Sequence, residues 1–400
     1  LRMSRGLGDV YKRQYINSIQ FSGRRVTSLI NIGGYNETIE TTINCSFGVN
    51  VVADRIDAFV CGLLYFAMKG GYDIVSELPI SDQLYYNLEY HFIDAIVSAN
   101  NFLHRIRIKA PLVEVIQNRG NRIATGISCG VDSLYTVATH TGSYIPQCRK
   151  INTLAYFNAG SSPGNKQHSD LTKGRYLHAK SFAQEYGFDF IDIETNLHLV
   201  MNKYLPYSHI ENHTYMALFC MLHLQGAIST YYYSSGYSYE EFSLKKIAGH
   251  DFTVAKYDLL LLSMASTDTL RFYSTGGERS RFEKTKVVSL YQPSKKYLNV
   301  CVNKPPRDGN DNTCFKCIRT LLTLDALGVI DEYNAVFDIE FYKHNKKVYL
   351  RRMWLNGTFK HDDMLIELLP YYKKEITFLF KVKALFNVLL NKLFNKKSIV

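Results

Sequence analysis

The hydrophobic positions of the chain follow two periods, and the change between them separates predicted strands from predicted helices. Beyond residue 118, short runs rich in β-branched and aromatic residues alternate with longer segments whose apolar residues recur every three to four positions. The repeated strand–helix order predicts an α/β fold with a doubly wound, mostly parallel sheet. Strands are expected over 122–127, 151–158, 188–193 and 230–235.

The residues before this segment predict a small α+β unit over 15–115. Strands are expected over 26–32 and 41–47, and a buried helix over 57–68 ends near Gly70 and Gly71. Ser81-Asp82 is a candidate cap for a further helix. The stretch Asp9-Val10-Tyr11-Lys12-Arg13-Gln14 matches a translated sequencing-adapter end, so we interpret residues 1–14 as an artefact and expect the natural N-terminus to be absent.

A tight turn follows the first strand of the alternating segment and leads into a helix. Its sequence is Ser128-Cys129-Gly130-Val131-Asp132-Ser133. The first N–H groups of a helix have no intrahelical partner, and the helix dipole adds positive potential, so a strand–turn–helix is a potential anion site. Gly130 lets the backbone approach a ligand, the serines add donors, and Asp132 is placed to cap first-turn amides or to hold a cation.

The turn resembles the Ser-Gly-Gly-x-Asp-Ser loop of the PP-loop ATP pyrophosphatases, which include 7-cyano-7-deazaguanine synthases, tRNA-thiolating enzymes and the asparagine synthetase ligase domain. Cys129 stands where that family usually has glycine, and a cysteine does not reach φ > 0 cheaply. The resemblance implies a Rossmann-like PP-loop fold with ATP and Mg²⁺ as cofactors. It also implies nucleotide contacts from Ser128, Cys129, Gly130, Val131, Asp132 and Ser133, with Phe157 and Asn158 at the end of the next strand.

A cationic segment over 276–286 is the second feature with chemical potential. It holds Arg279, Arg281, Lys284 and Lys286 within eleven residues. Fixed cations stabilise the charge that develops on a leaving pyrophosphate, so we assign that role first to Arg281 and Lys284 and then to Lys286. The alternative interpretation is a solvated loop of mixed charge.

Three cysteines near residue 310 are candidate metal ligands. Cys314 and Cys317 form a Cys-x-x-Cys pair, a spacing suited to Zn²⁺, and Cys301 supplies a third thiolate. Spacing does not choose the fourth ligand among His250, Asp311 and Cys148, and two buried thiols or a redox pair are alternatives. Three motifs follow one another along the chain: the turn, Ser-Arg-x-Glu-Lys and Cys-x-x-Cys-x-Arg-Thr. This order resembles that in PP-loop proteins related to the 7-cyano-7-deazaguanine synthases. A further cysteine of that group corresponds to Asp311 here.

Charge is concentrated at the two ends of the chain. The net charge is +11 (47 − 36), but residues 1–14 contribute +3 and residues 373–400 contribute +6, which leaves +2 for the body. This balance does not favour nucleic-acid binding by the folded core. Single, dispersed cysteines and the lack of a visible signal peptide indicate a cytoplasmic protein.

The C-terminal region over 331–400 ends in a predicted basic amphipathic helix. Its apolar positions are Phe378, Leu379, Val382, Leu385, Phe386, Leu389, Leu390 and Leu393, with lysines between them. Docking of this helix on the body is the first expectation, and contact with an anionic membrane surface is the alternative.

The sequence therefore predicts a PP-loop nucleotide-binding domain over 116–330 and an ATP-dependent adenylating ligase that acts on a small-molecule carboxylate or amide. Two alternatives remain: a tRNA-thiolating enzyme, and a non-catalytic nucleotide-binding protein of a defence or glycan operon. Cys129 is interpreted as a tolerated small residue; as a thiol at a helix start, it is otherwise a candidate nucleophile or sulfur carrier with a lowered pKa. The acceptor and the oligomeric state are not predicted.

Overall fold

The computed structural model describes residues 12–115, 120–161, 170–302 and 309–393. The chain divides into two compact units, each built from two segments. We call residues 1–127 and 140–277 the sheet unit, and residues 128–139 and 278–400 the helical unit. The segments expected from the sequence, 15–115, 116–330 and 331–400, follow other boundaries and stay predictions.

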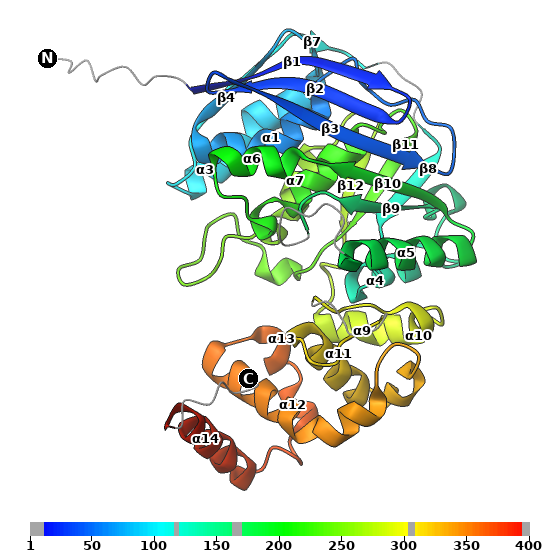
Figure 1. Ribbon diagram of the computed structural model, residues 1–400, viewed down its shortest axis with the longest axis vertical. Coiled ribbons are helices and arrows are strands. Elements are labelled where there is room, and N and C mark those ends of the chain that lie inside the picture. Colours follow the sequence, from blue (N-terminus) through cyan, green and yellow to red (C-terminus); the bar gives the residue numbers. More distant parts are fainter. Residues whose placement is uncertain (1–11, 116–119, 162–169, 303–308, 394–400) are drawn as a thin grey trace, which may run out of the picture. The chain divides into compact units, whose positions relative to one another are not determined.

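The sheet unit contains a ten-stranded sheet in the order β12-β11-β8-β9-β10-β3-β2-β1-β4-β6 (Figure 1). The strands are β1 (Lys12–Ser22), β2 (Arg25–Ile32), β3 (Tyr35–Cys45), β4 (Tyr72–Ser76), β6 (Ile108–Lys109), β8 (Arg122–Gly126), β9 (Thr153–Asn158), β10 (Asp189–Thr195), β11 (Ile228–Ser234) and β12 (Arg271–Thr275). A separate two-stranded sheet pairs β5 (Ile80–Ser81) with β7 (Leu112–Val113). The strands of the expected α+β unit thus share one sheet with the later strands.

The pairing confirms an α/β fold with a mostly parallel sheet. β8 to β12 pair in parallel, and β10 then pairs antiparallel with β3, which begins the β3-β2-β1 meander. From β8 the chain adds β9 and β10 on one side and β11 and β12 on the other, so the strand order reverses beside β8. In open α/β sheets such a switch point is where ligands bind, outside the carboxyl ends of the strands.

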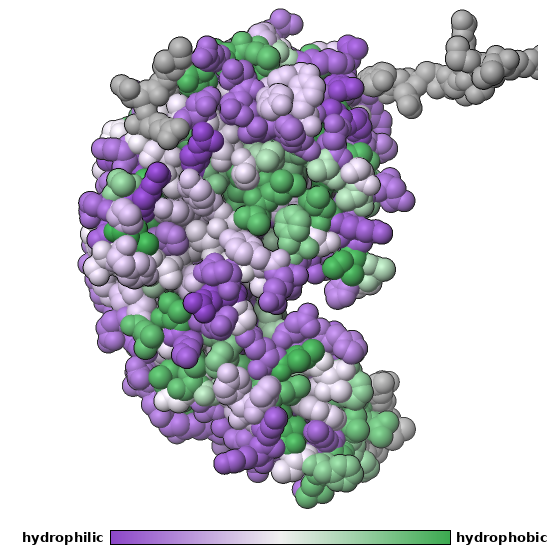
Figure 2. All heavy atoms as spheres, turned by 180° about the vertical axis from the view of Figure 1, so that it is seen from behind, coloured by the Kyte–Doolittle hydropathy of each residue, from purple (hydrophilic) through white to green (hydrophobic). Residues whose placement is uncertain are grey.

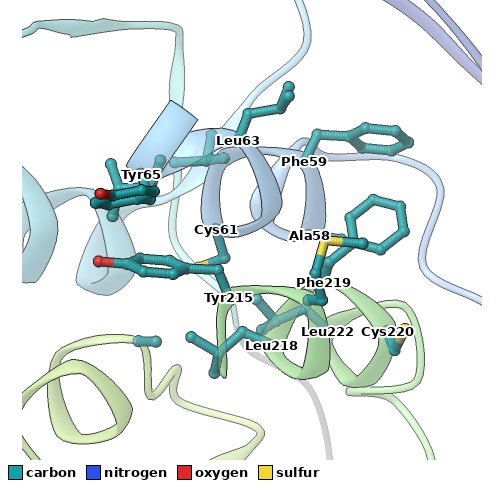
Figure 3. Packing of buried hydrophobic residues seen from close by; sticks show 14 of the residues in the cluster. Ala58, Phe59, Cys61, Leu63, Tyr65, Tyr215, Leu218, Phe219, Cys220 and Leu222 are labelled. Atoms are coloured by element: carbon teal, nitrogen blue, oxygen red, sulfur yellow. The ribbon is translucent and has the colours of Figure 1, made fainter. Parts of the chain in front are cut away.

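Helices cover the sheet and supply much of its core. They are α1 (Asp57–Gly70), α2 (Asp82–Asn87), α3 (Ile93–Ala99), α5 (Asp170–Glu185), α6 (Leu197–Tyr204), α7 (His209–Leu222) and α8 (Asp258–Met264). α1 and α7 pack closely, with the rings of Phe59 and Phe219 edge to face at 5.4 Å (Figure 3). A Cβ at Gly62 would lie 2.8 Å from the Phe219 ring, so only glycine permits this approach.

The end of α1 follows the predicted signal, whereas the start of α2 does not. Gly71, with φ of 69°, terminates α1, and Gly187, with φ of 72°, follows α5. Ser81 does not cap α2; its backbone N–H instead donates to the buried Asp57 carboxylate at 2.8 Å. Lys12 to Gln14, the last three residues of the expected artefact, belong to β1, whereas residues 1–11 lie outside the described residues.

The helical unit is built around α11 and α12. Its helices are α4 (Val131–His140), α9 (Arg281–Leu290), α10 (Ser294–Tyr297), α11 (Phe315–Ala326), α12 (Ile339–Lys360), α13 (Asp363–Ile366) and α14 (Phe378–Leu393). α11 contacts both α9 and α12, and Leu321, Leu322 and Met353 are buried between helices of this unit. Among the described helices of the whole chain, none has the combined length and hydrophobicity that a bilayer crossing requires.

Candidate nucleotide site and metal centre

The predicted phosphate loop forms a small closed turn at the start of α4. The Ser128 and Ser133 hydroxyls lie 3.2 Å apart, and the N–H of Gly130 donates to Ser128 Oγ at 3.3 Å. The Gly130 carbonyl then accepts from the N–H of Leu134 at 3.0 Å, which begins the helix. Ser128 is exposed, and Gly130 and Asp132 are partly exposed, so an anion can reach the polar edge of the turn.

Cys129 adopts a left-handed backbone conformation, which glycine reaches most easily. Its φ is 57°, in the left-handed region, where a side chain costs about 1–2 kcal/mol. The thiol is fully buried, and burial raises the pKa of Cys129. The expectation of a lowered pKa at this helix start is therefore wrong, because burial disfavours the charged thiolate.

Asp132 brings together the loop and the cationic segment. Its Oδ2 accepts from Arg281 Nη1 at 2.8 Å, and its Oδ1 lies 3.2 Å from Lys284 Nζ. Burial alone would raise the pKa of Asp132, but the charges and hydrogen bonds of the two cations outweigh it and lower the pKa. Lys284 is 1% exposed, so its ammonium is held at the first turn of α4 by a charged partner.

The start of α9 fixes these two cations. Ser280 and Glu283 form a capping box: the N–H of Glu283 donates to Ser280 Oγ at 3.2 Å, and the N–H of Ser280 donates to Glu283 Oε2 at 3.0 Å. Glu367 accepts from the Ser280 hydroxyl and from the N–H of Phe282. The Ser-x-x-Glu spacing is typical of such a helix start. In a helix that begins here, Arg281 and Lys284 are three residues apart and therefore lie on one face.

The remaining predicted residues are Lys286, in α9, and Phe157 and Asn158, in the sheet unit. Lys286 is exposed and stands five residues after Arg281, about 140° around the helix, so it does not join the Asp132 group. Phe157 and Asn158 end β9 in the sheet unit; β9 runs parallel to β8, which ends at the same edge of the sheet. Tyr135, on α4, donates a hydrogen bond to Glu278, a contact that the sequence did not indicate.

The predicted metal ligands form one cluster in the helical unit. The ligand atoms of Cys301, Asp311, Cys314 and Cys317 all lie within 4.8 Å of one another. A tetrahedral zinc site needs ligand atoms about 3.8 Å apart, a separation that small side-chain adjustments reach. The structure selects Asp311 as the fourth group, whereas the other candidates, His250 and Cys148, belong to the sheet unit and are not part of this cluster of described residues.

The electrostatics of the cluster suit a cation. A hydrogen bond with the Cys317 thiol lowers the pKa of Cys314 to about 6, and the same pairing, together with burial, raises the pKa of Cys317. The N–H of Cys317 also donates to Cys314 Sγ at 3.4 Å, since Cys314 is the N-cap of α11. The cluster can therefore hold a metal ion such as Zn²⁺.

Two asparagines support the ligands from outside. Asn310 Oδ1 accepts from the N–H groups of Val300 and Cys301 at 2.8 and 3.1 Å, and its amide donates to Leu298 and Val336 carbonyls. Asn312, with φ of 61°, donates to the carbonyl of Asp338 at 2.6 Å and so ties the ligand turn to the start of α12. Such outer contacts fix ligand orientation before a metal arrives.

Comparisons with known proteins give no relative: no protein-family model, no curated protein and no solved structure matches the chain.

Proposed function

We propose that the helical unit binds the phosphates of ATP at residues 128–133 and that the protein is a PP-loop adenylating enzyme for a small-molecule carboxylate or amide. The observation that carries this proposal is the placement of Arg281 and Lys284 at the first turn of α4. A helix N-terminus with two fixed cations beside it is complementary to a polyphosphate. An exposed serine hydroxyl and a glycine at the turn add donors and room for close approach.

In the proposed reaction, an oxygen of the substrate attacks the α-phosphorus of ATP, and the bond from that phosphorus to the bridging oxygen of pyrophosphate breaks. Charge develops on the departing pyrophosphate, where Arg281 and Lys284 stabilise it most. Ammonia or another nucleophile then attacks the adenylated carbon and displaces AMP. Asp132 orients both cations throughout, because each of its oxygens already accepts from one of them.

Mg²⁺ does not fit the role predicted for Asp132. Both oxygens of that carboxylate face cations, so a metal ion there would be repelled by the charges of Arg281 and Lys284. Zinc, by contrast, fits the Cys301–Cys317 cluster, where it would join the turn before α11 to the segment that carries Cys301 and so support the unit structurally.

The alternative of sulfur transfer receives no support from the loop. A carrier thiol has to be exposed and largely ionised, whereas Cys129 is buried and its pKa is raised by that burial. We therefore retain adenylation as the proposed chemistry.

The test measures ATP binding first and turnover second. Calorimetry with ATP should show that Arg281→Gln and Lys284→Gln each lower the affinity by about tenfold or more, the usual loss for a hydrogen bond to a charged group. Lys286→Gln is the matched control, because it removes the same charge from an exposed position of the same helix.

Turnover is then assayed with ATP, ammonia and a panel of carboxylic acids, and AMP and pyrophosphate are quantified. Release of ADP and phosphate instead would contradict adenylation. Equal effects of Lys286→Gln and Lys284→Gln on ATP affinity would show that general charge, not the site, attracts the nucleotide.

A further inference from the structure

The last described helix exposes a continuous apolar face. The side chains concerned are between 41% and 83% exposed, and they belong to Phe378, Leu379, Val382, Leu385, Phe386 and Leu389. Figure 2 shows this helix as a hydrophobic area at its end of the helical unit. The helix does contact the rest of its unit, as expected, but it does so through a different face, so these six side chains stay exposed.

The covered face is narrow and lies opposite. Ala384 is buried, Phe380 and Val388 are partly buried, and α14 contacts α12. At 100° per residue, the six exposed apolar side chains occupy an arc of about 120°. Lys381 and Lys383 fall on the two flanks of that arc, and both are exposed.

We propose that α14 lies in the surface of an anionic phospholipid bilayer, with its apolar arc among the acyl chains and its flanking lysines at the headgroups. This arrangement of an apolar face between basic flanks is that of interfacial helices. At about 24 Å and with lysines in its sequence, the helix is too short and too polar to cross the bilayer.

The charge of α14 favours a lipid surface, rather than a second copy of the chain, as the partner of its apolar face. α14 contains lysines and no acidic residue, and residues 373–400 carry seven lysines against Glu375 alone. Two copies that met through this face would bring lysine flanks together, which is unfavourable, whereas an anionic surface attracts every one of them. The proposal does not depend on the proposed ATP chemistry.

The experiment is vesicle flotation of the full chain. The probes are vesicles of phosphatidylcholine alone and vesicles in which about one third of the lipid is phosphatidylglycerol. Leu379→Ser/Phe386→Ser removes apolar contact, and Lys381→Gln/Lys383→Gln removes flanking charge. All four positions are exposed, so the fold should tolerate the changes.

Two matched variants serve as controls. Leu290→Ser/Phe359→Ser changes exposed apolar residues of the same unit outside α14, and Lys347→Gln/Lys360→Gln gives the same net charge as the lysine variant. Circular dichroism verifies folding of each protein.

We expect binding to the anionic vesicles and not to the neutral ones, loss of binding in the Leu379/Phe386 variant, and a drop of about tenfold to thirtyfold in the Lys381/Lys383 variant. The controls should bind like the unchanged protein. No flotation with anionic vesicles, or flotation that the Leu379/Phe386 change leaves intact, would overturn the proposal. Light scattering provides a second contradicting result. If the unchanged protein is a dimer and the Leu379/Phe386 variant is a monomer, the apolar face is a contact between copies and the proposal is wrong.

Discussion

Replacement of Cys129 tests whether the loop is held in a left-handed conformation. Alanine and glycine both remove the buried thiol, but only glycine adopts a φ of 57° without steric cost. The carbonyl of Cys129 accepts from the N–H of Asn299 at 2.8 Å, so the loop is tied into the helical unit and its strain affects the stability of that unit.

The magnitude follows from two opposing terms. Relief of the left-handed strain favours glycine over alanine by about 1–2 kcal/mol, and the greater freedom of glycine in the unfolded chain returns about 0.5–1 kcal/mol. Cys129→Gly should therefore exceed Cys129→Ala in unfolding free energy by about 0.5–1 kcal/mol. At Thr136, a buried position within α4, the order should be reversed, with glycine about 1 kcal/mol below alanine.

Urea unfolding followed by tryptophan fluorescence provides the assay. Trp354 is the single tryptophan of the chain; it lies in α12 and is nearly buried, so its emission reports the helical unit. An alanine variant at 129 as stable as the glycine variant, or more stable, would refute a left-handed Cys129. If Thr136→Gly is not less stable than Thr136→Ala, the fluorescence does not report the unfolding of α4.

Three further predictions concern charge and metal. Asp132→Asn should lower the unfolding free energy of the helical unit by about 2 kcal/mol, because Arg281 and Lys284 lose their acceptor charge; unchanged urea midpoints by Trp fluorescence would contradict this. Burial lowers the pKa of His223 from 6.5 to about 4, so the folded state favours the neutral ring: its contribution is complete above pH 6.5 and decreases by about 3 kcal/mol as the pH falls to 4. Hydrogen exchange of α7 at pH 7 and 4.5 measures this loss, and the His223→Leu variant should lack it. Elemental analysis should find about one zinc per chain, and Asp311→Cys should resist a chelator longer than the unchanged protein; a zinc-free protein after growth and purification with zinc would exclude the site.

The local pattern was sufficient for most elements and insufficient for their assembly. The strand period located β8 to β11, and glycines marked the end of α1. The antiparallel pairing of β3 with β10 depends on residues roughly 150 positions apart, such as Asn44 and Asp192, which no local pattern specifies. Local patterns therefore did not reveal that strands of the 15–115 segment share one sheet with the later strands.

In the candidate site, too, the local sequence indicated individual residues but not how they come together. Residue type indicated Asp132, Arg281 and Lys284, but only the capping box at Ser280 determines which cations share a face, so Lys286 could not be separated from the others by charge alone. For the metal centre, the cysteine spacing indicated three ligands. The choice of Asp311 required the left-handed turn at Asn312, which arises from contacts with α12.

The helical unit takes its first segment from residues 128–139 and the remainder from residue 278 onward. During synthesis, α4 therefore leaves the ribosome well before its partners, since Asp132 and Arg281 are 149 positions apart. At about 5–20 residues per second, the nascent loop waits roughly 7–30 s for the cations that neutralise its carboxylate. A translation product that stops at residue 277 would carry α4 without any of those partners, which makes this helix a point where truncated chains become visible to chaperones and proteases.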